Sequence, residues 1–574
     1  MALLSRDRRG RPGSEMHRAT FAAAVALLLT GGPVVAAGTD WPVYGGNMAN
    51  WGYSELARID RSNVKDLDLA WAFSLGTLLS QESRPLVVDG TLYVTSSAGP
   101  RHVYALDAAT GEMKWQTGFE MPEGVQQYGC CGQVNRGPAY ADGVLYVGRL
   151  DGKLTALDAD SGKELWTAEV VDYTQGAVIT SPPLVVKDKV IVGFGGGEYG
   201  VRGYVSAFEA KTGERLWKTW TIPGPGAPGN ESWKGDSWKH GGGAAWLVAS
   251  YDAERNLVYY GTSNPSPWNA AVRGPNTSDY GPFTNKWTAA TIALDADTGE
   301  IVWGFQGTPH DAWDYDGVNE LILADLDIDG DGKKEPLGLK ADRNGFFFVL
   351  DRSNGKALRA DPFVTVNWAE GYDLEAQRPI EVPAKRPGIG KRAVDICPNL
   401  IGGKNWQPMA FSPDTGLVYI PSNNLCMDME DSEVEYRRGM FYLGKEFPTK
   451  EGPGGYLGEL IAWDPVRGKK VWGAKEKWPF NGGVLTTAGG LVFAGNYEGL
   501  FRAFDATTGE LLWQKRLGSG IHAAPITYEV DGRQYVAVVV GRSQTIPGFL
   551  GDVGRRMYAA VPQGGMLFVF ALDG

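Results

Sequence analysis

The sequence predicts an all-β fold, an eight-bladed β-propeller whose repeats dock through tryptophan. Three observations carry this prediction. A motif of a small, an apolar and an acidic residue, followed by a turn, a glycine and a tryptophan, recurs along the chain. Its first three acidic positions, Asp107, Asp158 and Glu209, stand at intervals of 51 residues, which suits one four-stranded blade per repeat. Strand-like apolar runs surround the motifs, and little looks helical.

Each copy of the motif is a hairpin in outline, because alternating apolar residues lead into an Asp-x-x-Thr-Gly turn or a close variant and alternating residues lead out. The copies that keep the tryptophan end at Trp115, Trp166, Trp217, Trp303, Trp472 and Trp513. A degenerate copy, from Val349 to Leu358, lacks it. We expect each indole to pack on the neighbouring blade and to serve the fold and not the chemistry.

Two gaps between motifs, from Glu209 to Asp295 and from Asp351 to Asp464, are too long for one plain blade. They must hold insertions or degenerate blades. A radial array of repeats also needs its ring closed, so residues 38–574 are expected to form one propeller domain.

The first 37 residues have the pattern of a signal peptide: scattered arginines, an apolar run from Phe21 to Leu29, and the small residues Val35-Ala36-Ala37. Met16 is an alternative start that still leaves a short basic segment before the apolar run. Because this run is shorter than the roughly 20 residues of a spanning helix, we predict no membrane span. Export implies an oxidising compartment, which we expect to be the bacterial periplasm.

Composition excludes some classes of function. Charged residues make up 21% and hydrophobic residues 43% of the chain, which is typical of a globular protein and not of a disordered one. The net charge is −12 and no block rich in lysine and arginine offsets it. Because phosphate neutralisation needs clustered cations, we expect no nucleic-acid partner.

The four cysteines leave their pairing open. Cys130 and Cys131 are adjacent, and their α-carbons must lie about 3.8 Å apart, below the roughly 4.4–6.8 Å usual for a disulfide. Geometry alone therefore predicts that these neighbours do not pair. Four cysteines allow three connectivities, and if Cys397 pairs with Cys426 then the two neighbours are left for each other.

Several segments, taken together in their order and spacing, are highly specific. They are Cys130 to Gly137, Gly195 to Gly203, Gly242 to Trp246, Gly261 to Asn269 and Thr308 to Gly317. In this combination the chain resembles the quinoprotein alcohol dehydrogenases, which hold pyrroloquinoline quinone (PQQ) beside a metal ion. The resemblance extends along essentially the whole chain after the signal peptide.

PQQ is a flat ortho-quinone with three carboxylates, so its pocket needs two flat walls and cations or donors at the rim. The resemblance implies that a Cys130–Cys131 disulfide covers one face and Trp246 the other, and that Cys397 and Cys426 form a second disulfide. The remaining cofactor-binding residues implied by it are Glu82, Arg136, Thr180, Gly196, Gly197, Arg343 and Asn405.

This sequence departs from the family pattern at two places. Ala244 stands where a threonine is expected, which removes a hydroxyl that could bind a PQQ carboxylate. Phe480-Asn481 replaces a tryptophan before a pair of glycines, as in the ethanol-type and not the methanol-type members.

The implied metal ligands are Glu198, Asn264, Asp314 and Asp316. All are oxygen donors, which suits a hard cation. Positions two apart in an extended segment share a face, so Asp314 and Asp316 can approach one ion. In calcium-dependent methanol enzymes the second position is small and uncharged, and an aspartate there resembles the lanthanide type, because an added carboxylate stabilises a trivalent ion more than a divalent one. The alternatives are Ca²⁺ as the ion, or an Asp316 that caps a turn or binds arginine.

A second acidic segment, from Asp325 to Gly330, begins like an EF-hand loop. Its twelfth position is Pro336 instead of glutamate, and no helices are predicted beside it. We therefore expect an acidic hairpin tip.

The resemblance implies oxidation of a primary alcohol to an aldehyde, with Asp314 as the catalytic base that takes the alcohol proton. The sequence has no Cys-x-x-Cys-His haem motif, so a separate soluble cytochrome c is the expected electron acceptor. A homodimer is compatible with the resemblance. The rival interpretations are a calcium-dependent enzyme and a non-catalytic propeller scaffold of the kind found in outer-membrane assembly lipoproteins.

Overall fold

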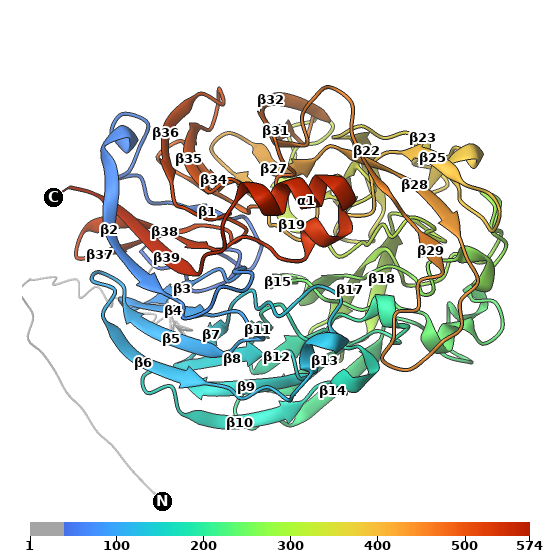
Figure 1. The fold of residues 1–574 in the computed structure, drawn as a ribbon, viewed down its shortest axis with the longest axis horizontal. Coiled ribbons are helices and arrows are strands. Elements are labelled where there is room, and N and C mark those ends of the chain that lie inside the picture. The colour runs from blue at the N-terminus through green and yellow to red at the C-terminus, as the bar shows by residue number, and fades with distance from the viewer. Residues whose placement is uncertain (1–38, 574) are drawn as a thin grey trace, which may run out of the picture. The chain divides into compact units, whose positions relative to one another are not determined.

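The computed structural model describes residues 39–573, so the predicted signal peptide, residues 1–37, lies outside the described residues. Within the compact unit Gly38–Gly574, eight antiparallel blades of four strands each are present in residues 39–573. The blades follow one another around a ring in chain order (Figure 1). The predicted all-β, eight-bladed propeller is confirmed.

The first four blades are continuous in sequence. Blade 1 holds β3 (Leu86–Val88), β4 (Thr91–Thr95), β5 (His102–Asp107) and β6 (Met113–Gly118). Blade 2 holds β7 (Ala139–Ala141), β8 (Val144–Gly148), β9 (Lys153–Asp158) and β10 (Glu164–Glu169). Blade 3 holds β11 (Leu184–Val186), β12 (Lys189–Val192), β13 (Tyr204–Glu209) and β14 (Arg215–Trp220). Blade 4 holds β15 (Ser250–Asp252), β16 (Leu257–Gly261), β17 (Ala290–Asp295) and β18 (Ile301–Gln306).

The other four blades include the insertions and the ring closure. Blade 5 holds β19 (Ile322–Leu326), β20 (Glu335–Ala341), β21 (Phe346–Asp351) and β22 (Ala357–Pro362). Blade 6 holds β26 (Ala410–Ser412), β27 (Leu417–Asn423), β31 (Gly458–Asp464) and β32 (Lys469–Glu476). Blade 7 holds β33 (Val484–Thr487), β34 (Leu491–Gly495), β35 (Leu500–Asp505) and β36 (Leu511–Arg516), and β1 (Tyr53–Ser54) adds to it in parallel. Blade 8 holds β37 (Ile526–Val530), β38 (Arg533–Val540), β39 (Met566–Leu572) and the N-terminal β2 (Leu67–Ser74).

The long gaps between motifs contain insertions and no degenerate blade. After blade 5 come the hairpin of β23 (Ala369–Asp373) and β24 (Arg378–Glu381) and then β25 (Ala393–Ile396). Between β27 and β31 the chain adds β28 (Leu425–Asp431), β29 (Lys445–Glu446) and β30 (Thr449–Glu451). The helix α1 (Gly551–Ala560) lies between β38 and β39.

The motif tryptophans dock the blades, as predicted. Each indole N–H donates to a backbone oxygen of the next blade over 2.9–3.3 Å. The glycine of the motif is required by this contact: Gly162 has a φ of +68°, and a Cβ there would lie 2.5 Å from the Trp115 ring. A typical repeat therefore supplies a tryptophan to one neighbour and a glycine turn to the other.

The ring closes through a blade that the termini share. In blade 8, Trp71 in β2 pairs with Val569 in β39, where the other motif tryptophans pair with the alanine of their motif. The Trp71 indole donates to the Ala108 oxygen of blade 1 over 3.3 Å. Sequence analysis missed Trp71, because its repeat is split between the two ends of the chain.

The degenerate copy joins blades 5 and 6 differently. Arg359 replaces the indole and donates to the backbone oxygens of Val466 and Arg467 over 3.1 and 3.2 Å. Its guanidinium also pairs with Asp361 at 3.0 Å. Polar contacts thus take over the docking at this junction.

No helix within residues 39–573 combines the length and the apolar character needed to cross a bilayer.

Candidate active site

The topology gathers the predicted site residues at one end of the propeller. In an antiparallel blade, the loop from strand 2 to strand 3 and the connection to the next blade emerge at the same end. Glu198 and Arg343 lie in loops of the first kind, after β12 and β20. Trp246 and Asp314 lie in connections of the second kind, after β14 and β18.

These loops enclose a cavity of about 230 Å³. The predicted site residues that line it are Glu82, Cys130, Cys131, Arg136, Thr180, Gly196, Glu198, Trp246, Asp314, Asp316, Arg343 and Asn405. Gly197 and Asn264 do not line it and lie directly behind the wall, where a Cβ on Gly197 would be 2.5 Å from the Asn264 Oδ1. Gly196 has a φ of +139°, and a Cβ there would come within 2.6 Å of the Gly176 oxygen, so only glycine fits this stretch of wall.

Adjacent cysteines form one wall of the cavity. Cys130 and Cys131 are disulfide-bonded, with α-carbons 3.8 Å apart. The expectation from geometry alone, that neighbours do not pair, is wrong, and the pairing implied by the resemblance is present. The Thr545 hydroxyl donates to the Cys131 oxygen over 2.7 Å and anchors this turn. Cys397 and Cys426 form the second disulfide.

Aromatic rings and a cation form a second part of the wall. The Trp246 indole N–H donates to the Asp316 Oδ2 over 3.1 Å, which fixes the ring in its plane. The Arg136 guanidinium lies 5.3 Å from the Trp246 ring centroid and 4.5 Å from that of Trp406. Trp406 lines the cavity and was missed by sequence analysis, because nothing in the sequence separates it from the many structural tryptophans.

Arg136 links the rim residues to one another. It donates to the Thr180 hydroxyl over 2.6 Å and pairs with the Glu82 carboxylate at 2.9 Å. Burial raises the pKa of Glu82, and the Arg136 cation opposes that effect. The Arg136 Nε has no hydrogen-bond partner among the described residues and stays available to a ligand.

Asp314 is held in an unusual backbone conformation. Its φ is +63°, in the left-handed region. The Asp311 carboxylate accepts hydrogen bonds from the backbone N–H groups of Trp313 and Tyr315, each over 2.9 Å, on either side of Asp314. Asp311 therefore positions Asp314, and this too was missed, because its role depends on a turn that the sequence does not reveal.

The two paired aspartates differ in how their oxygens are used. Asp316 accepts from the Asn264 backbone N–H and from Trp246, and forms an ion pair with Arg343. Asp314 lies 3.9 Å from Arg343, and its Oδ1 has no hydrogen-bond partner in residues 39–573. The Asn264 Oδ1 is likewise buried without a partner in this range.

The pKa values of the cavity carboxylates are raised above their ordinary range. Burial, together with the nearby Asp316, raises the pKa of Glu198 to about 7. Burial also raises the pKa of Asp314, with Asp316 and Glu198 adding to the effect and Arg343 opposing it. Carboxylates crowded in this way, with free oxygens on Asp314 and Asn264, fit a hard cation with oxygen ligands.

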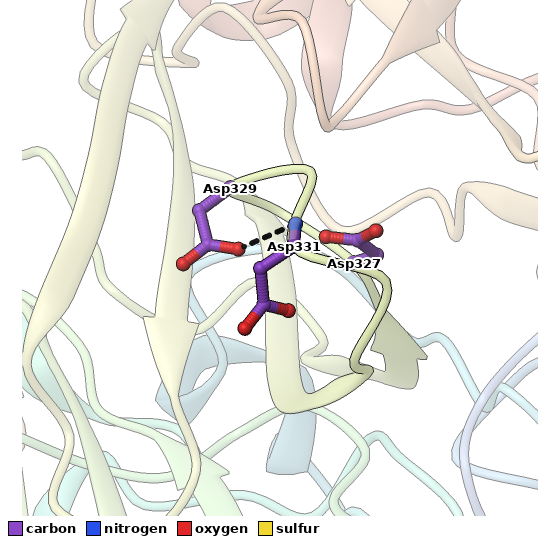
Figure 2. Close-up of side chains that lie close together, drawn as sticks. All are labelled: Asp327, Asp329 and Asp331. Atoms are coloured by element: carbon purple, nitrogen blue, oxygen red, sulfur yellow. Dashed lines mark hydrogen bonds between the residues drawn. The ribbon is translucent and has the colours of Figure 1, made fainter.

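The second acidic segment is the predicted hairpin tip, between β19 and β20. Ligand atoms of Asp327, Asp329 and Asp331 lie within 4.8 Å of one another (Figure 2). Asp325 is not part of this group and pairs instead with Arg352.

Neither departure from the family pattern lines the cavity. Ala244 is buried in the apolar core of blades 2 and 3. Asn481 is fully buried, and neither amide atom has a hydrogen-bond partner in the part of the chain that is described.

Comparison with known proteins agrees with this site. The family model for the glucose, ethanol and alcohol dehydrogenase β-propeller domain that carries PQQ matches residues 41–360 and 457–536. The chain is 45% identical to a lanthanide-dependent methanol dehydrogenase of Methylacidiphilum fumariolicum, over 93% of this chain and 92% of that one. It is 43% identical to the quinoprotein alcohol dehydrogenase PedH of Pseudomonas putida, over 91% and 89%.

Among solved structures, a europium-containing methanol dehydrogenase superposes with a TM-score of 0.88 and 44% identity, covering 93% of this chain and 98% of that one. A non-catalytic scaffold is therefore not the class of this protein. The chain belongs to the PQQ-dependent quinoprotein alcohol dehydrogenases.

Proposed function

We propose that this enzyme oxidises primary alcohols to aldehydes in the bacterial periplasm, using PQQ and a lanthanide ion, and passes the electrons to a soluble cytochrome c. The observation that carries the proposal is a single cavity lined by Asp314, the Trp246 indole and the Cys130–Cys131 disulfide, in which the Asp314 Oδ1 has no hydrogen-bond partner among residues 39–573.

The cavity fits a planar anion. An indole and a disulfide ring supply flat apolar walls, while Arg136 and Arg343 each keep an Nε without a hydrogen-bond partner among residues 39–573. Glu82, Thr180, Gly196, Gly197 and Asn405 would complete the rim. Because burial of unpaired guanidinium N–H groups is unfavourable, carboxylates or quinone oxygens are the natural partners of the two arginines.

Glu198, Asn264, Asp314 and Asp316 would hold the metal ion. The three carboxylates carry more negative charge than Arg343 neutralises. Each carboxylate stabilises a bound trivalent cation more than a divalent one. The name of the Methylacidiphilum relative points the same way. One observation favours the calcium alternative: Asp316 is already engaged by Arg343 and Trp246.

The chain's own residues then account for proton handling and charge. When bound, PQQ supplies a two-electron acceptor and the ion supplies a Lewis acid. Asp314 takes the proton of the alcohol hydroxyl, because its free Oδ1 faces no competing donor. Arg343 is buried, and its guanidinium lies 3.9 Å from the Asp314 carboxylate. It stabilises negative charge that develops on this side of the cavity.

The partners follow from the chemistry and the sequence. Reoxidation requires an external one-electron acceptor, since the sequence lacks a Cys-x-x-Cys-His haem motif. A soluble cytochrome c in the periplasm meets this need. We further propose a homodimer.

A dye-linked assay of purified protein reconstituted with PQQ tests the proposal over a panel of primary alcohols with La³⁺ or Ca²⁺. We expect aldehyde formation with La³⁺ and little with Ca²⁺. Activity with Ca²⁺ alone would establish the calcium alternative, and absence of activity with either ion would contradict the proposal. Substitution of the dye by a cytochrome c tests the acceptor separately.

A further inference from the structure

A second pocket borders blade 3 and shares no lining residue with the cavity of the active site. It encloses about 320 Å³ and is lined chiefly by Arg202, Tyr204, Lys218, Trp220, Trp238 and Tyr436. Gly200 and Val201 of its wall directly follow Glu198 and Tyr199, which line the active-site cavity. Strand β14 (Arg215–Trp220), which carries Lys218 and Trp220, is the outer strand of the blade (Figure 1).

Two cations of this pocket, Arg202 and Lys218, have no carboxylate counter-ion among the described residues. Arg202 donates to the Ile222 oxygen over 2.9 and 2.7 Å, but no carboxylate of the described residues lies within 4.0 Å of it or of Lys218. Lys239 is the exception on this wall and pairs with Asp236 at 2.7 Å. Arg202 and Lys218 therefore form a local positive patch in a chain with a net charge of −12, and such a patch attracts an anion.

The cations also repel one another. Partial burial, together with the neighbouring Arg215 and Arg202, lowers the pKa of Lys218 to about 8. Lys218 is still mostly charged at neutral pH, so the repulsion persists in the free protein. An anion bound between Lys218 and Arg202 would relieve it.

Aromatic rings form the rest of the pocket wall. The Lys218 ammonium lies 3.7 Å from the Tyr204 ring centroid and 3.9 Å from that of Trp220. The Arg202 guanidinium lies 4.1 Å from the Trp220 centroid and 4.8 Å from that of Trp238. Cation–π contacts hold both cations in place without neutralising their charge. Trp220 remains 39% exposed, so ring surface that the cations leave uncovered is open to contact with a flat ligand.

We infer that this pocket is a binding site for an aromatic carboxylate, with the carboxylate between Lys218 and Arg202 and the ring against Trp220 and Trp238. Charge alone would serve any anion, and the aromatic wall selects a flat one. The site is separate from the alcohol-oxidising cavity and does not depend on its cofactor or metal.

Ligand-observed NMR titration of the holoenzyme with benzoate tests the inference. Benzamide, which keeps the ring but not the charge, and acetate, which keeps the charge but not the ring, are the reference ligands. We expect benzoate to bind about tenfold more tightly than either of them. Lys218→Gln should weaken benzoate about tenfold, and Lys218→Arg should restore most of the affinity.

Lys114→Gln is the matched control, because Lys114 is an exposed lysine on β6, the outer strand of blade 1, with only the Thr91 hydroxyl as partner. It should leave benzoate affinity unchanged. Benzoate binding that survives Lys218→Gln would place the ligand elsewhere, the alcohol cavity included, and overturn the inference. Equal affinity for benzoate and benzamide would do the same, and equal affinity for acetate would refute the aromatic part.

Discussion

Two acidic clusters in this protein share a sequence spacing and differ in everything else. Asp314 and Asp316 stand two residues apart, as do Asp327, Asp329 and Asp331. The first pair is buried in the candidate active site, beside Glu198 and Arg343. The second group lies on a hairpin tip, where Asp329 and Asp331 are exposed. The comparison shows that environment, and not spacing, decides what a carboxylate cluster can do.

Hydrogen bonding separates the two clusters further. At the tip, both Asp327 oxygens accept from backbone N–H groups, and Asp331 pairs with Lys333 at 2.7 Å. This hydrogen bond to Lys333 lowers the pKa of Asp331. In the cavity, burial raises the pKa of Glu198, and the Asp314 Oδ1 has no hydrogen-bond partner in the described part of the chain. The carboxylates of the tip find hydrogen-bond partners within their own loop, whereas those of the cavity need a ligand to complete their hydrogen bonding or coordination.

The largest expected effect comes from Asp314→Asn. An amide cannot take the alcohol proton, so turnover should fall by at least about 10³-fold, at the strong end of general-base effects. PQQ should remain bound, because the change conserves shape. Dye-linked rates and the absorption spectrum of the bound cofactor measure the two properties. Asp329→Asn, the same change at the tip, should alter neither, and retained turnover in Asp314→Asn would reject this residue as the base.

A change of metal preference is expected for Asp316→Ala. Loss of one carboxylate weakens binding of a trivalent ion more than that of a divalent ion, so La³⁺ affinity should fall at least about tenfold relative to Ca²⁺. Titration of activity with each ion gives the ratio. Asp329→Ala is the matched control and should leave the ratio unchanged. An unaltered preference in Asp316→Ala would mean that Asp316 serves Arg343 and Trp246 and not the metal.

The propeller was predictable from the sequence because each repeat docks on the next one through residues of a short local motif. The tryptophan of one motif copy packs on the glycine turn of the next copy, so a single short motif encodes both sides of the contact. The prediction failed at Trp71, since its partner strand, β39, lies at the other end of the chain. Contacts within one repeat can be inferred from one stretch of sequence, and ring closure cannot.

The candidate site was predictable only through the resemblance. Chain geometry argued against the Cys130–Cys131 disulfide, and spacing could not tell Asp314 from Asp327. The supporting residues Asp311 and Trp406 were not predicted at all. Their roles arise where loops from different blades meet, so no local pattern encodes them.

The pH dependence of metal binding should distinguish the clusters next. Because the pKa of Glu198 in the metal-free protein is raised to about 7, this carboxyl group keeps its proton up to neutral pH. Metal binding must displace that proton and any proton on Asp314, whose pKa is also raised by burial, so affinity should fall by at least about tenfold for each pH unit below 7. Titration with Tb³⁺ from pH 5 to 8, followed by its luminescence, measures the slope. Glu198→Gln should make the slope shallower, and a flat profile in the unmodified enzyme would show that the ion does not displace the proton of Glu198.

The smallest effect is expected at the hairpin tip itself. Asp329 is exposed, and its Oδ1 accepts one hydrogen bond, from the Asp331 backbone N–H over 3.2 Å. Asparagine can accept the same bond, so Asp329→Asn should shift Tm by less than about 2 °C. Thermal unfolding with and without La³⁺ measures this shift, and the stabilisation by the ion should equal that of the unmodified enzyme. A smaller stabilisation in Asp329→Asn would show that the tip also binds the ion. The proposed difference, between a loop that supplies its own hydrogen-bond partners and a cavity that needs a ligand, would then be wrong.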